Sequence, residues 1–310
     1  HRLGPDQVHV IIVGRTGIDR PPVRYQRHVI AKPTAVEQAG AVLQRVVRPP
    51  HTSLQEAALW SARVLAAIAE QLAEIRADLQ IWDTMRTGQY ARYMGRKPRA
   101  LYADDLFSKR YASMLDRIDQ DQSEVTDPLG EFGKLLPRAV GRVVERKFVY
   151  RRLLQLEQAS TARSEDQAPE LFDATLLVNA QESDELYERT GNPTISTLLP
   201  MLREPARHVR GWDGQPVFVF LGGLDFAPNR DGLTWFLATF REQVLAAIPA
   251  FRLLVVGRGS SRPLPEAAAW GEHVQVLGWV DDLDEVLGSC AALLSPLPIR
   301  SGDKIGRAHV

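Results

Sequence analysis

The feature that most constrains the fold is a regular alternation of apolar strands and helices in the last third of the chain. It begins after a stretch rich in Gly, Pro and Asn, residues 191–216, which predicts a domain boundary. The predicted elements are a strand at 217–221, a helix at 231–247, a strand at 251–256, a helix at 265–270, a strand at 274–277, a helix at 283–289 and a strand at 292–295. Strands that alternate with helices form βαβ units around a parallel sheet, so the predicted fold class is α/β.

The first two thirds of the chain follow the same plan less regularly. The predicted elements are a strand at 8–14, a helix from the Ser53–Glu56 capping-box pattern to about residue 77, strands at 79–82 and 99–103, a helical segment at 107–162, a polar loop at 163–169, a strand at 172–178 and a helix at 181–189. We therefore expect two Rossmann-like, doubly wound parallel-sheet domains, over residues 1–200 and 214–303.

The residues at both ends of the sequence indicate that the chain is a fragment of a longer protein. The chain begins at His1 and enters a buried strand within a few residues, and it stops shortly after the strand at 292–295, which should need a covering helix. Residues 304–310 also resemble the in-frame translation of a sequencing adapter, so the native sequence is expected to end near Asp303. On this interpretation the first strand of one domain and the last part of the other are missing.

Composition excludes several classes of protein. There are 38 basic and 38 acidic residues, so the basic excess typical of nucleic-acid binding is absent. The single cysteine, Cys290, allows no intrachain disulfide and suits a reducing compartment. No apolar run approaches the roughly 20 residues that span a bilayer. The 7 histidines show no metal-ligand spacing, so no metal site is expected.

Three glycine-containing turns follow predicted strands of the last third. They are Gly222-Gly223, then Gly257-Arg258-Gly259, and then Arg300-Ser301-Gly302 with Lys304 nearby. Doubly wound sheets bind ligands at the carboxyl ends of their strands, where backbone amides favour phosphate. Glycines after parallel strands also simply form turns, and the sequence leaves these two interpretations open.

Acidic and basic residues offer further candidates. Asp104-Asp105 ends a predicted strand and could bind substrate or act as a base, or could cap the next helix. Asp281-Asp282 is interpreted as a helix cap before Leu283. A basic cluster at 134–152 favours a solvated helix face, with contact to anionic lipid as the alternative. No Gly-x-Ser-x-Gly elbow, P-loop or complete Gly-x-Gly-x-x-Gly pattern is present.

Five ordered pieces carry a resemblance to a known family. They are VFVFLGGLDFAPN at 217–229, DGL at 231–233, FRLLVVGRG at 251–259, VQVLGWVDDL at 274–283 and LSPLPIRSG at 294–302. Together they resemble the donor half of family 4 glycosyltransferases of the GT-B fold. The N-terminal half resembles, more weakly, the acceptor half of the bacterial branch that makes exopolysaccharides, through the segments at 86–90, 105–111 and 172–178 and through Glu157.

The resemblance implies transfer of a sugar from a nucleotide-sugar donor, with retention of configuration and without a metal or other cofactor. Its acceptor would be a glycan or a lipid-linked intermediate, met in the cytoplasm or at the cytoplasmic face of the inner membrane. By position, the implied donor-binding residues are Gly222, Gly223, Gly257, Arg258, Gly278, Val280, Arg300, Ser301, Gly302 and Lys304. The acceptor-side candidates are Arg86, Asp104 and Asp105.

Two departures from the family keep rival functions open. Gly223 and Asn229 stand where many members carry Arg and Lys, so the cation is expected from Arg300, from Lys304 or from a residue that the sequence does not identify. The family's pair of glutamates should lie beyond residue 303, so no catalytic residue is assigned and this fragment is expected to be inactive. The rivals are a GT-B-fold sugar-nucleotide epimerase, for which the histidines are sparse, and a non-catalytic GT-B-like binding subunit.

Overall fold

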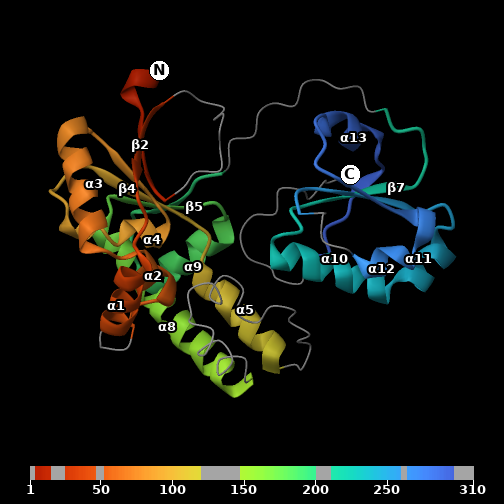
Figure 1. Ribbon diagram of the computed structural model, residues 1–310, viewed down its shortest axis with the longest axis horizontal. Helices are drawn as coiled ribbons and strands as arrows, with labels where there is room; N and C mark the ends of the chain where they lie inside the picture. Colours follow the sequence, from red (N-terminus) through yellow and green to blue (C-terminus); the bar gives the residue numbers. More distant parts are fainter. Residues whose placement is uncertain are drawn as a thin grey trace. The chain divides into compact units, whose positions relative to one another are not determined.

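The computed structural model divides into two compact units (Figure 1). The N-terminal unit comprises residues 1–116 and 131–199, and the C-terminal unit comprises residues 117–130 and 200–310. The structure describes residues 4–14, 25–46, 52–119, 147–199, 211–259 and 264–296. Both units have parallel sheets covered by helices, which confirms the predicted α/β class.

The N-terminal unit contains two parallel sheets. The first pairs β1 (His9–Val13) with β2 (Gln26–Ile30). The second has the strand order β3-β4-β5-β6, with β3 at Gln80–Asp83, β4 at Arg99–Asp104, β5 at Ala174–Leu177 and β6 at Ile195–Thr197. No sequence pattern predicts β2 or β6, because both are short and largely solvent-facing and so lack the apolar run that marks a buried strand.

Seven α-helices of this unit are described. They are α1 (Ala35–Arg45), α2 (Leu54–Leu59), α3 (Ala62–Ile75), α4 (Thr84–Gly88), α5 (Phe107–Asp119), α8 (Lys147–Leu171) and α9 (Ala180–Thr190). The buried core gathers side chains from α3, β4, β5 and α9, including Val64, Ile68, Leu101, Leu177 and Leu186. No helix in the described part of the chain, α8 with its 25 residues included, is long and apolar enough to cross a membrane.

The prediction of one helix from Ser53 to about residue 77 is wrong, because the helix is broken between α2 and α3. Trp60 and Ser61 are extended, and the Ser61 side chain caps α3 by accepting from the backbone of Val64. The fully buried Tyr90 fixes the break: its hydroxyl accepts from the Ser61 amide at 3.0 Å and donates to the Leu59 carbonyl. The Tyr90 hydroxyl, 29 residues from Ser61 in the sequence, thus bonds to backbone groups that would otherwise be paired within a continuous helix.

The predicted loop at 163–169 is also wrong, because α8 continues through it to Leu171. The polar composition of residues 163–169 suggested an exposed loop, but Glu165 is only 5% exposed and accepts from the Ser108 amide at 3.0 Å. Pro169 lies in the last turn, where it has no amide hydrogen to donate to the carbonyl four residues earlier, so α8 lacks one backbone bond there. The basic residues at 134–146 lie outside the described residues.

The C-terminal unit is one parallel sheet with the strand order β10-β7-β8-β9. The strands are β7 (Val217–Leu221), β8 (Arg252–Val256), β9 (Val274–Gly278) and β10 (Ala292–Leu293). The helices are α10 (Ala227–Thr239), α11 (Arg241–Ala247), α12 (Pro265–Ala268) and α13 (Leu283–Ser289). Figure 1 shows α10, α11 and α12 on one side of the sheet and α13 on the other, as in a doubly wound fold.

One helix of this unit differs from its prediction. The segment predicted as a helix at 231–247 begins earlier, at Ala227, and is interrupted at Phe240 to give α10 and α11. Pro228, in the first turn of α10, suits a helix start because it lacks the amide that would be unbonded there. The interruption coincides with a cluster in which the Phe240 ring contacts Trp235 and Phe236.

Candidate functional site

The loops after β7, β8 and β9 are joined by backbone hydrogen bonds at the carboxyl edge of the C-terminal sheet. The Gly222 amide donates to the Val256 carbonyl at 2.9 Å, and the Leu224 amide donates to the Arg258 carbonyl at 2.7 Å. The Gly257 amide donates to the Gly278 carbonyl at 2.8 Å. Two predicted turns, at Gly222-Gly223 and at Gly257 to Gly259, therefore do lie side by side at one edge.

Close packing between these loops explains two of their glycines. A Cβ on Gly257, whose φ is +146°, would lie 2.1 Å from the carbonyl oxygen of Gly222. A Cβ on Gly222 would lie 2.8 Å from the side-chain nitrogen of Asn229. Gly257 is thus required by the fold itself, and Gly222 leaves room for the Asn229 side chain, so the presence of these glycines alone does not indicate a ligand.

Gly223 differs from these two because no atom of the described residues crowds it. The nearest atom to a Cβ on Gly223 would be the Arg258 carbonyl oxygen at 3.8 Å, an ordinary contact. Its amide has no hydrogen-bond acceptor among the described residues. Its carbonyl is held by the Asn229 side chain at 3.0 Å, so the loop's orientation is fixed from α10. Gly223 therefore presents a fixed and unbonded backbone donor.

The loop after β9 adds an aromatic side chain. Trp279 is 66% exposed, and the guanidinium carbon of Arg258 lies 4.8 Å from the centre of its ring. Gly278, with φ +74°, forms the turn before it. Val280, which the resemblance implies as a donor-binding residue, packs its side chain with Val219 and Val256 against α13.

The other predicted donor-side residues, Arg300, Ser301, Gly302 and Lys304, lie outside the described residues.

The carboxyl edge of the N-terminal sheet carries charged side chains instead of glycines. Arg86 and Arg110 both lie near the ring of Phe107, with guanidinium carbons 5.9 and 4.6 Å from its centre. Asp105 is 5% exposed, and one of its carboxylate oxygens lies 2.6 Å from Arg110. The other oxygen is buried without a partner. The acceptor-side candidates Arg86 and Asp105 are thus brought together around Phe107.

Asp104 completes this edge in a strained conformation. Its φ is +69°, a left-handed value that non-glycine residues seldom adopt. Burial raises the pKa of its carboxyl group, and the nearby charges of Asp105 and Asp83 raise it further. The hydroxyl of Tyr102 lies 3.5 Å from one carboxylate oxygen. Strain of this kind is often kept at functional positions, so Asp104 is a candidate for a side chain that contacts substrate.

Helix caps account for other acidic residues. The Glu285 amide donates to Asp282 at 3.0 Å, which confirms the predicted cap before Leu283. At the start of α5, the amides of Leu106 and Ser108 donate to Glu182 and Glu165. These two buried glutamates were missed, because their partners are 76 and 57 residues away in the sequence.

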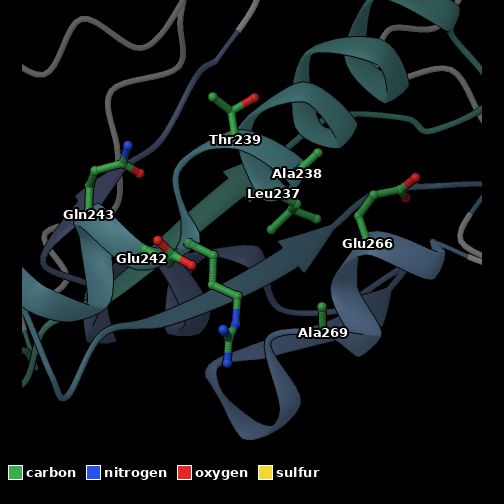
Figure 2. A pocket seen from close by; sticks show the side chains of 8 residues that line it. Leu237, Ala238, Thr239, Glu242, Gln243, Glu266 and Ala269 are labelled. Atoms are coloured by element: carbon green, nitrogen blue, oxygen red, sulfur yellow. The ribbon is translucent and has the colours of Figure 1, made fainter.

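A separate cavity of about 510 Å³ lies among the helices of the C-terminal unit (Figure 2). Its lining comes from the end of α10, the start of α11 and from α12, and consists of Leu237, Ala238, Thr239, Arg241, Glu242, Gln243, Glu266 and Ala269. None of the sequence-predicted site residues contributes to it. In the described part of the chain, no group of three or more His, Cys, Asp or Glu side chains is arranged to hold a metal ion.

Comparison with known proteins identifies the class to which this fold belongs. A sucrose-phosphate synthase from Thermosynechococcus elongatus matches with a TM-score of 0.56 at 14% identity, over 96% of this chain and 67% of that chain. A UDP-glucosyltransferase from Polygonum tinctorium matches with a TM-score of 0.43 at 15% identity, over 94% and 76% of the two chains. Os79 from O. sativa, in complex with UDP, gives 0.45 and 13%, over 92% and 70%. The fold is GT-B, with two Rossmann-like halves.

Part of the chain also matches the model of a protein family. Residues 215–306 match the model described as Glycosyl transferases group 1, which covers the edge formed by the loops after β7, β8 and β9. No curated protein matches the chain significantly. The family match and the fold together support a GT-B glycosyltransferase.

Proposed function

We propose that the protein is a retaining glycosyltransferase that moves a sugar from a nucleotide-sugar donor to a glycan or lipid-linked acceptor in bacterial surface polysaccharide synthesis. One observation carries the proposal. The region that matches the glycosyltransferase family presents the unbonded Gly223 amide at the carboxyl edge of a doubly wound sheet. Ligands of such sheets bind at this edge, and backbone amides there favour phosphate.

The donor's diphosphate would accept a hydrogen bond from the Gly223 amide. Arg258, Arg300, Ser301, Gly302 and Lys304 are the proposed flanking residues. In the reaction, the bond between the sugar's anomeric carbon and the diphosphate breaks, and the acceptor oxygen bonds to that carbon from the same face. The acceptor's proton leaves with the diphosphate. Backbone donors and a cation stabilise the negative charge that develops on the leaving group, so we propose that no metal is needed.

The acceptor would bind at the edge of the N-terminal sheet. The carboxylate of Asp104 can accept hydrogen bonds from sugar hydroxyls, and Arg86 can pair with the phosphate of a lipid-linked intermediate. The buried carboxylate of Asp105 would hold Arg110 in place beside them. Such an acceptor would be met at the cytoplasmic face of the membrane, and we propose peripheral contact there.

Gly223→Ala tests the donor site without disturbing the fold. The added Cβ has room within the protein, but it would stand where the ligand approaches. We expect the Kd for UDP or GDP, measured by calorimetry on the full chain, to rise on the order of tenfold, as for loss of a hydrogen bond to a charged group. The thermal midpoint should not change. Gly288→Ala is the matched control, because a Cβ there meets nothing within 4 Å and, like that on Gly223, makes no close contact.

Sugar transfer is measured in a separate assay. UDP-glucose and GDP-mannose are incubated with sugar acceptors in the presence of EDTA, and the anomeric configuration of any product is determined by NMR. A product of inverted configuration, or a requirement for a divalent cation, would contradict the retaining, metal-independent mechanism. A wild-type chain that binds no nucleoside diphosphate and no sugar nucleotide would overturn the donor site itself.

A specific observation also supports a second candidate, a non-catalytic binding subunit. Asn229 stands where the resemblance leads one to expect a cation, and its amide is used to hold the Gly223 carbonyl. The neighbouring Arg230 donates from Nε to the Leu224 carbonyl at 2.9 Å, so this side chain also holds the loop after β7 in place. This candidate predicts nucleotide binding without transfer to any acceptor.

A further inference from the structure

Two histidines from different strands meet on one face of the small β1–β2 sheet. Nδ1 of His9 lies 3.0 Å from Nε2 of His28, and the two rings stack with their centres 5.3 Å apart. In the parallel register His28 pairs with Ile11, two residues after His9, so the two histidines are diagonal neighbours on the same face. Spacing along the sequence does not reveal this pair, because its members are 19 residues apart.

The strands that carry the pair are held in place by the core. Ile11 of β1 and Ile30 of β2 pack in the apolar cluster that also contains Val64 of α3. Each histidine stands two residues before one of these isoleucines and therefore shares its side of the sheet. Neither histidine belongs to the cluster, and His9 is exposed while His28 is half-buried. The pair is thus built on fixed strands and remains accessible to solvent.

The two facing nitrogens are as far apart as two ligands of one metal ion. Imidazole nitrogens bind Zn²⁺ at about 2.0–2.1 Å, which places two such ligands roughly 2.9–3.4 Å apart, for angles from a right angle to the tetrahedral value. The observed 3.0 Å lies in this range. Both nitrogens can offer lone pairs if the ring protons are on His9 Nε2 and His28 Nδ1. These two atoms have no hydrogen-bond partner among the described residues, so nothing there opposes these tautomers.

We propose that His9 and His28 form a two-histidine site for a divalent transition-metal ion such as Zn²⁺, with water in the remaining positions. Imidazole suits ions of this class, whereas Mg²⁺ and Ca²⁺ prefer oxygen ligands. No third His, Cys, Asp or Glu of the described residues completes the site, so it is open and binds less tightly than a four-ligand site. The bound ion would tie β1 to β2. The proposal does not depend on the proposed sugar transfer, for which no metal is invoked.

Zinc binding to single variants of the full chain tests the proposal. His9→Gln and His28→Gln each remove one ligand. We expect either change to raise the Kd for Zn²⁺, measured by calorimetry, about tenfold or more, because loss of a mere hydrogen-bond partner of a ligand already costs that much. The double variant should bind Zn²⁺ no more weakly than either single variant, since the two ligands act as a unit. Mg²⁺ should bind neither the wild type nor the variants at this site.

His273→Gln is the matched control. His273 lies in the C-terminal unit, with Nδ1 2.8 Å from the Phe251 carbonyl oxygen, and its replacement should leave the Kd for Zn²⁺ unchanged. Zn²⁺ should also raise the thermal midpoint of the wild type and of His273→Gln, because a ligand of the folded state stabilises that state. The midpoints of His9→Gln and His28→Gln should respond much less to Zn²⁺.

Three results would overturn the proposal. If the wild type binds no Zn²⁺, or if His9→Gln and His28→Gln bind it as tightly as the wild type, the two rings are joined by a hydrogen bond and nothing more. If His273→Gln weakens zinc binding equally, the ion binds elsewhere. In long-range ¹⁵N–¹H NMR spectra, Zn²⁺ should shift His9 Nδ1 and His28 Nε2, and a shift of the opposite ring nitrogens alone would contradict the assigned ligands. Each of these results leaves the proposed nucleotide-sugar site untouched.

Discussion

The two four-stranded sheets make their carboxyl edges in different ways. In the C-terminal unit the left-handed positions are occupied by glycines, Gly257 at φ +146° and Gly278 at φ +74°. In the N-terminal unit they are occupied by residues with side chains, Thr84 at φ +60° and Asp104 at φ +69°. A left-handed non-glycine residue costs roughly 1–2 kcal/mol. One edge thus brings backbone groups close together, whereas the other keeps its side chains at an energetic cost.

This difference suits the two kinds of substrate that the protein is proposed to bind. A diphosphate is recognised by backbone amides, and these come within reach only where side chains are absent. A sugar hydroxyl is recognised by carboxylates, so the acceptor edge has to retain Asp104 and Asp105. Three substitutions test this contrast, and a pH dependence tests two buried glutamates of the N-terminal unit.

The largest effect is expected from Gly257→Ala. The added Cβ would lie 2.1 Å from the Gly222 carbonyl oxygen, and both atoms belong to backbone that cannot move independently. We expect the free energy of unfolding to fall by about 3 kcal/mol or more, the scale of severe core and backbone clashes. Chemical denaturation measures it, with Gly223→Ala as the comparison. Equal stability of the two variants would show that the loops are not interlocked.

The N-terminal unit should lose stability as the pH rises. Glu157 and Glu165 are buried and accept from the amides of Leu54 and Ser108. Burial is the main cause that raises the pKa of each carboxyl group to about 7 from 4.5. Because the folded value exceeds the unfolded one, the stability that each group contributes is complete below 4.5 and is lost as the pH rises through about 7.

For each of these two groups we therefore expect the free energy of unfolding to fall by about 2 kcal/mol between pH 5 and pH 8, followed by denaturation in urea. Glu157→Gln keeps a side-chain acceptor for the Leu54 amide but cannot ionise, so it should flatten part of this dependence. A matched change at an exposed acid, Glu170→Gln, should not. Wild-type stability that rises over the same range would contradict the prediction.

Asp104→Gly should separate strain from function. Glycine adopts a φ of +69° without cost, so we expect the protein to gain about 1 kcal/mol in stability while transfer to the acceptor falls. Arg76→Gly is the matched control, because Arg76 has φ +53° at the exposed end of α3, away from the edge. It should gain similar stability with unchanged transfer. If Asp104→Gly also leaves transfer unchanged, the strain has no part in acceptor binding.

The smallest change in stability is expected from Asp104→Asn. Asparagine tolerates the left-handed conformation and removes the negative charge beside Asp83 and Asp105. Loss of that repulsion should raise the thermal midpoint slightly, by the equivalent of about 0.5 kcal/mol. The KM for the acceptor should rise, since an amide replaces a carboxylate as the hydroxyl's partner. An unchanged KM would place acceptor recognition on other residues.

Local patterns predicted some elements to the residue. The strand Val217–Leu221 and the helix Leu283–Ser289 have the predicted bounds, and Asp282 caps the helix as expected. These features depend on neighbouring residues: an apolar run ended by glycines, and a carboxylate three residues before the amide that it accepts from. The fold class follows from the same information, because alternation of strands and helices is itself a property of the sequence.

The features that local patterns did not predict depend on contacts between residues that are distant in the sequence. The break at Trp60 and Ser61 depends on the hydroxyl of Tyr90, and the helix through 163–169 depends on the burial of Glu165 against Ser108. The sequence placed Gly222, Gly223 and Gly257 in turns after strands, but the glycines look alike in sequence. Only the tertiary structure shows that two of them are filled by the protein's own atoms and that Gly223 is open, because that depends on which chain segments come within 3 Å of each position.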